Sequence, residues 1–201
     1  MNQSIINICN LALSNMGGNQ LKTVNALSES TSEARACNRL YPQILSSLLR
    51  KHPFGFACVE APLGLLQVYD NRHLPYEYAY PADALRIWSV GLEGGFHEYR
   101  LPVSSFTIGY GQAGRVIRTA LDQAFAYYSR YVDDPNRFDA LFTDAVVWAL
   151  TSQLCMALAN DARRAEMFAQ RAAAAYEMAT GADANESAFD VPEPYFITER
   201  Y

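Results

Sequence analysis

The stretch LSSLLRKHPFGFACVEAPLGLL (residues 45–66) changes its hydrophobic period at its middle. Up to His52 the apolar residues recur every three or four positions, which predicts an amphipathic helix. Pro53 ends it, because proline lacks a backbone donor and disfavours helical geometry in the residue before it. Phe54, Phe56 and Val59 then continue as an apolar extended segment. This stretch therefore predicts a fold in which a helix runs directly into a strand.

The residues before this stretch predict two helices. Apolar residues from 4 to 16 keep a helical spacing, and Gly17-Gly18 is expected to end the first helix. Ser30 and Glu33 have the spacing of a capping box, in which each side chain accepts from the other's backbone, so they predict the start of the second helix. Pro42 lies inside this helix and is expected to bend it.

Residues 56–132 have a different pattern, in which prolines and glycines separate short runs of β-branched and aromatic residues. Short strands bounded by turn residues are typical of an antiparallel β region. The predicted strands are Tyr76–Tyr80, Leu85–Val90, Ser105–Ile108, Arg115–Thr119 and Phe125–Val132.

Helical spacing returns at Asp134-Pro135, where an acidic cap precedes proline at the first helical position. A fourth helix, rich in alanine, is predicted over residues 161–180 and is expected to end at Gly181. The fold class is therefore α+β: a four-helix bundle (1–55 and 133–185) with an inserted, mainly antiparallel β domain (56–132). Residues 186–201 are expected to form an extended C-terminal arm.

Composition limits the classes of function. The chain has 201 residues, a net charge of −5 and no cluster of basic residues, which argues against a surface that grips nucleic acid phosphates. The start of the chain lacks the pattern of a signal peptide, and no run of about 18 uninterrupted apolar residues predicts a membrane helix. The four cysteines are far apart and are expected to be free thiols in a reducing compartment.

One motif suggests an enzyme. Gly109-Tyr-Gly-Gln-Ala-Gly114 has the G-x-G-x-x-G spacing of dinucleotide-binding loops, and Asp133 and Asp134 follow about twenty residues later, as that fingerprint requires. The fingerprint must also open a helix inside a β-α-β series. The residues after Gly114 predict strand, turn and strand instead, which favours turn glycines in a β loop over nucleotide binding.

Other chemistry has no positive signal. His52, His73 and His97 lack the spacing of metal ligands, and no nucleophile elbow is present, so we expect no catalytic residues, no metal and no cofactor. A pair of glycosidase carboxylates stays open as an alternative, because acidic residues are numerous and their distances are not set by the sequence.

Residues 52–57 (His-Pro-Phe-Gly-Phe-Ala) carry a resemblance to a known family. They resemble the Pro-Trp-x-Phe-Ala motif that follows an LL-bearing helix in the tail tubular protein A family, the head-to-tail adaptors of short-tailed bacteriophages. Phe54 replaces the usual Trp and keeps an aromatic side chain there. The other matches follow in chain order and together cover nearly the whole chain: Asn10, Leu13 and Gly17; residues 80–86 (YPADALR); residues 131–139 (YVDDPNRFD); and the acidic tail with its final Arg200.

The resemblance implies a structural protein of the virion that is assembled in the host cytoplasm. It implies a dodecameric ring between the portal protein and the tail nozzle protein, with genomic DNA passing through the lumen without specific binding. Rings are expected to form on the portal, because an adaptor that polymerised alone would assemble prematurely. A virion-associated peptidoglycan glycosidase and, less strongly, a nucleotide-binding enzyme stay as alternatives, and no membrane partner is expected.

The tail supplies the predicted interface residues. It is rich in large apolar groups although it lacks a helix or strand pattern, which is unusual for a free end. We expect it to bind the portal or a neighbouring subunit through Phe189, Tyr195, Phe196, Ile197 and Tyr201. Packing of the tail on its own helices is the alternative.

Overall fold

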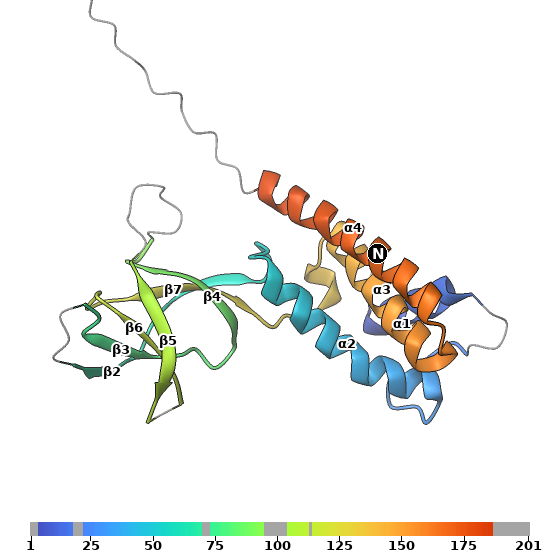
Figure 1. Ribbon diagram of the computed structural model, residues 1–201, viewed down its shortest axis with the longest axis horizontal. Helices are drawn as coiled ribbons and strands as arrows, with labels where there is room; N and C mark the ends of the chain where they lie inside the picture. The colour runs from blue at the N-terminus through green and yellow to red at the C-terminus, as the bar shows by residue number, and fades with distance from the viewer. Residues whose placement is uncertain (1–3, 18–21, 70–72, 95–103, 113, 187–201) are drawn as a thin grey trace, which may run out of the picture.

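The computed structural model describes residues 4–17, 22–69, 73–94, 104–112 and 114–186, and it separates helices from strands in space (Figure 1). The helical part contains α1 (Ile5–Met16), α2 (Ser32–Lys51), α3 (Ala140–Leu154) and α4 (Ala162–Glu186). The strands lie between residues 58 and 130, in the chain between α2 and α3. The predicted α+β class, with mainly antiparallel strands, is confirmed.

Helix α3 is the centre of the helical part, where it contacts α1, α2 and α4. Its buried residues therefore point to several sides, and Phe142, Leu150 and Leu154 are fully buried. Residues Ala140–Ala159 are long and apolar enough to cross a membrane by length and composition, with a mean hydropathy of 1.4. The core helix of a bundle passes the same test, and 56% of this window is buried, so the pattern is weak evidence for a membrane span.

The first two helices begin and end close to the predicted residues. Gly17 ends α1 at a φ of 62°, a left-handed value that glycine adopts without strain, and its N–H donates to Ser14 O. The predicted capping box of α2 is wrong. Thr31 is the N-cap and accepts from Ala34 N at 3.2 Å, while the Glu33 carboxylate accepts from Lys22 N at 3.2 Å. The Glu33 side chain therefore binds the loop before α2 and does not cap the helix. Pro42 lies inside α2, as predicted.

Two further helix boundaries were predicted wrongly. Asp134 caps only a short 3₁₀ turn, Pro135–Arg137, and α3 starts after Asp139, whose carboxylate accepts from Leu141 N at 2.8 Å. Helix α4 does not end at Gly181, since it continues to Glu186. Residues 182–186, which lie beyond the predicted end of this helix, are therefore helical. Between α3 and α4 lies a π-helical turn, Cys155–Ala159, which ends where Asn160 takes a left-handed conformation.

The strands form two antiparallel sheets. The first contains β1 (Cys58–Pro62), β7 (Phe125–Arg130) and β4 (Ala84–Gly91), in that order. The second contains β2 (Leu65–Val68), β3 (Tyr76–Ala79), β6 (Gly114–Thr119) and β5 (Phe106–Gly111). All pairings are antiparallel. Strand β2 was not predicted, because its four residues are all exposed and show no alternation of apolar and polar side chains.

A second apolar core joins the two sheets. Tyr78 and Ile117 of the second sheet are buried together with Ile87, Ala126 and Tyr128 of the first. The Tyr78 hydroxyl donates to Leu121 O at 2.7 Å, which satisfies its polar end within this core. The described part of the chain thus has two cores, one among the helices and one between the sheets.

Candidate assembly surfaces

The segment 52–57 forms the joint between the helical and β parts. His52 is the C-cap of α2 with an extended backbone, and Pro53 follows it. The carboxylate of Asp183, near the end of α4, binds this segment twice: Oδ2 lies 2.8 Å from His52 Nε2, and Oδ1 accepts from Gly55 N at 3.0 Å. The side chains of His52 and Asp183 are mostly covered, with exposed fractions of 23% and 18%. We call these contacts the Asp183 clamp.

An aromatic cluster lies directly beside the clamp. The Phe54 ring is edge-on to that of Phe142, with centroids 4.7 Å apart, and stacks on Phe56 at 5.5 Å. Phe138 packs edge-on against Phe142 at 5.3 Å, and Tyr176 of α4 meets Phe54 at 5.9 Å. Offset and edge-to-face pairs are the arrangements that aromatic quadrupoles favour. The apolar residues of the opening stretch therefore hold the joint together, and Phe54 is almost fully buried.

A cavity of about 460 Å³ opens between this cluster and the end of α4. Phe54, Phe56, Phe138 and Phe142 form its aromatic side, and Ala179, Ala182, Asp183 and Glu186 of α4 form the opposite side. Arg137 and Asp139 complete the lining. Arg137 donates from Nη2 to Phe56 O at 2.9 Å, so its guanidinium is held against the joint. We call this space the joint cavity.

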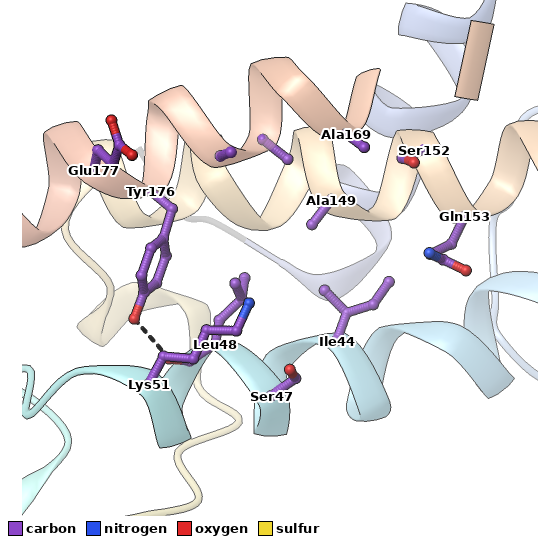
Figure 2. A pocket seen from close by; sticks show the side chains of 12 residues that line it. Ile44, Ser47, Leu48, Lys51, Ala149, Ser152, Gln153, Ala169, Tyr176 and Glu177 are labelled. Carbon is purple, nitrogen blue, oxygen red and sulfur yellow. Dashed lines mark hydrogen bonds between the residues drawn. The ribbon is translucent and has the colours of Figure 1, made fainter. Parts of the chain in front are cut away.

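A second hollow, the α2–α4 groove, crosses the helical part (Figure 2) and encloses about 380 Å³. Its α4 side is lined mainly by small residues, Ala169, Ala172 and Ala173, and its α2 side by Ile44 and Leu48. Small side chains allow another helix to approach closely.

Tyr176 closes one end of this groove. As Figure 2 shows, its ring reaches from α4 towards α2, and its hydroxyl donates to Leu48 O at 3.1 Å. The ammonium of Lys51 lies 5.7 Å from the ring centroid. Burial raises the pKa of Tyr176 to about 12, so the phenol stays protonated and keeps donating at any physiological pH.

The second sheet exposes apolar side chains at both of its edge strands. Leu65, Leu66 and Val68 of β2 are about half exposed, and on β5 Tyr110 is 80% exposed beside Ile108. Exposed apolar edge strands are surfaces on which other chains readily pair. These edges are therefore candidates for contacts with other protein chains.

The glycine motif lies in the β5–β6 hairpin and opens no helix. Gly109 and Gly111 are in β5, and Gly114 starts β6 with a φ of 107°. A Cβ on Gly111 would lie 2.9 Å from Glu77 Oε1, an atom of the carboxylate whose other oxygen meets Arg118 Nε at 2.8 Å. The spacing thus follows from close packing and a tight turn, which agrees with the β-loop interpretation.

The described residues bring together no evident catalytic or metal constellation. Among them, no group of three or more His, Cys, Asp or Glu side chains is placed to hold a metal ion. The Cys9 and Cys37 thiols are fully buried in the helical core, and a hydrogen bond between them raises the pKa of Cys9. A buried, protonated thiol is a poor nucleophile.

The predicted interface residues Phe189, Tyr195, Phe196, Ile197 and Tyr201 all lie outside the described residues. The structure therefore does not test the prediction that these residues form an interface. Sequence reasoning missed Asp183 and the joint cavity, because their partners are more than a hundred residues apart in the chain. The sequence carries no local signal for this contact, because Asp183 lies beyond the predicted end of the fourth helix.

The fold and these surfaces describe an α+β protein with two antiparallel sheets and several uncovered apolar surfaces. Comparison of the chain with models of known protein families gives no match, and comparison with curated proteins gives none either.

Proposed function

We propose that the protein is a structural subunit of a bacteriophage virion, a head-to-tail adaptor that forms a ring between the portal and the tail nozzle. The observation that carries the proposal is the joint at residues 52–57. The motif that resembles the tail tubular protein A family lies where α2 passes into β1, and the strands are inserted between two pairs of helices. The other resembling motifs follow in the expected order.

The surfaces of the chain support an assembling role. In this proposal, neighbouring subunits in a ring of twelve meet through the helical part, with the alanine-lined α2–α4 groove receiving a helix of the next copy. A contact between two different surfaces of identical chains closes into a ring when the rotation permits. The exposed edges of the second sheet serve the contact with the nozzle protein.

Charge is consistent with a DNA conduit. The net charge of −5 makes the protein repel phosphates on average, so that DNA in the lumen would pass without adhering. The proposal includes no catalytic step, no cofactor and no membrane. Residues 186–201 supply the contact with the portal, with Tyr195 and Phe196 as anchors.

The test is a binding experiment with purified portal protein. The full chain, mixed with portal at micromolar concentration, is expected to co-sediment and to add a ring at the tail-facing end of the portal in electron micrographs. A chain that ends at residue 191 keeps every described residue and is expected to lose portal binding. If the full chain does not bind the portal at this concentration, the adaptor proposal is wrong.

The groove is tested separately with a matched pair of variants. Ala173→Arg places a long charged side chain in the α2–α4 groove, whereas Gln170→Arg adds the same side chain to the same helix outside the groove lining. Both positions are exposed, so both variants are expected to fold. Only Ala173→Arg is expected to prevent complete rings on the portal. Equal ring formation by the two variants would exclude the groove as the subunit contact.

A further inference from the structure

The joint cavity has an aromatic side and an opening that no described part of the chain fills. Its floor consists of the nearly buried rings of Phe54, Phe138 and Phe142, and Phe56 is half-buried beside them. An apolar side chain entering this space would leave water and could add edge-to-face contacts to an existing aromatic cluster.

The rim of the cavity selects against acidic occupants. Three carboxylates line it, Asp139, Asp183 and Glu186, against the one cation Arg137 in the lining. Asp183 is already bound to His52 and Gly55, and Arg137 donates to Phe56 O. Another carboxylate brought among these groups would be repelled, and desolvating it in an apolar space would add to the cost. An uncharged aromatic or aliphatic side chain has neither cost. The cavity therefore suits a neutral, apolar group.

The chain itself supplies such a group within reach. Glu186 lines the cavity and is the last described residue, and the sequence continues Ser187-Ala188-Phe189-Asp190. Phe189 is the first large apolar residue after the cavity wall. Three residues span at most about 10 Å, so its ring cannot be far from the opening.

The residues that follow Glu186 differ in how well they suit the cavity. Acidic Asp190 and Glu193 would be disfavoured by the carboxylates of its rim, whereas Phe189 is uncharged and apolar.

We propose that Phe189 docks into the joint cavity of its own chain and fixes the root of the C-terminal arm against the joint between the helical and β parts. Residues after Phe189 are then left to meet a partner, and they leave the subunit from a defined point beside the Asp183 clamp. Fixing the root of an arm lowers the conformational entropy lost when its tip binds. The proposal concerns the isolated chain, so it can fail or succeed whatever the outcome with portal.

The first experiment places the photo-crosslinking analogue p-benzoylphenylalanine at position 189 of the full chain. Irradiation is expected to give crosslinks within one chain, to peptides containing residues 54–56 or 137–142. The same analogue at position 196 is the control and is expected to give none to these peptides. Crosslinks only between chains, crosslinks to other peptides, or the absence of crosslinks would each overturn the proposal.

The second experiment avoids the bulk of the analogue. Phe189→Ala is expected to lower the Tm of the helical part by about 3 to 6 °C, whereas Phe196→Ala is expected to change it by less than about 1 °C. Ala182→Arg fills the cavity from α4, and in this background Phe189→Ala is expected to have no further effect on the Tm. Equal effects of Phe189→Ala in the two backgrounds, or a Tm unchanged by Phe189→Ala in the natural one, would show that the ring does not occupy the cavity.

Discussion

Removing the Asp183 carboxylate is expected to loosen the joint measurably. Asp183→Ala deletes the hydrogen bond with His52 and the one from Gly55 N, at 2.8 and 3.0 Å. Each group is mostly covered by protein, so we take about 1 kcal/mol for each bond, below the range for a fully buried charged partner.

The interaction of Asp183 with the helix dipole has the opposite effect on stability. Asp183 lies in the last turn of α4, where a negative charge is repelled by the helix dipole, so its removal returns about 0.5 kcal/mol. The expected net loss in the free energy of unfolding is therefore about 1.5 kcal/mol, which lowers the Tm by about 3 to 6 °C in a protein of this size. Helix fraying should also appear beyond Gly181, because the clamp is what holds this last turn to the rest of the molecule.

The assay is urea denaturation followed by far-UV circular dichroism, with hydrogen exchange at the Gly55 amide as a local probe. The matched control is Glu186→Ala, which removes a carboxylate from the same exposed helix end and is expected to change stability by less than about 0.5 kcal/mol. If Asp183→Ala and Glu186→Ala give the same stability, and Gly55 exchange is unchanged, the clamp does not contribute to the fold.

Three further outcomes are expected. Gly111→Ala should lower the free energy of unfolding by about 1 to 3 kcal/mol in urea titrations, because its Cβ would lie 2.9 Å from Glu77 Oε1; an unchanged midpoint would mean that Glu77 moves freely. Gly181→Ala should instead raise stability by about 0.5 to 1 kcal/mol, since the position is helical with open space around it, and a loss would contradict the helical assignment. Hydrogen bonds from the Ser32 hydroxyl and backbone N–H groups lower the pKa of the Glu33 carboxyl below its usual 4.5, so this carboxylate stabilises the fold above that pH and its contribution is lost as the pH falls through the lowered pKa. Stability measured from pH 6 to pH 3 should therefore fall less steeply in Glu33→Gln than in the natural protein, and parallel profiles would exclude this role.

The alternation of helical and strand segments could be predicted because hydrophobic period is a local property. Apolar residues at three- and four-residue spacing can bury one side only as a helix, and Pro53 disfavours helical geometry in the residue before it. The same reasoning identified Gly17 as the end of α1, and it distinguished the hairpin glycines from a nucleotide loop by the strand-like residues that follow them.

Prediction from local spacing failed where two parts of the chain offer backbone donors to the same side chain. Ser30 and Glu33 have the spacing of a capping box, but Glu33 binds the backbone of Lys22, eleven residues earlier, and Thr31 caps the helix. Strand β2 gave no signal because an exposed edge strand has no buried face to impose alternation. Its existence depends on pairing with β3, a contact supplied by the rest of the sheet.

The sequence by itself determined the order of helices and strands, the α+β class, and the unusual transition from helix to strand at residues 52–57. Only the tertiary structure decided what that transition is attached to. Asp183 lies 131 residues from His52 in the chain, so no local spacing could pair them. Helix α4 continues through Gly181, and the distant contact joins its last turn to His52 and Gly55. That continuation brings Glu186 to the wall of an aromatic cavity. Bonds between distant residues form only once the chain is folded, and here they set both the end of the last helix and the surface beside it.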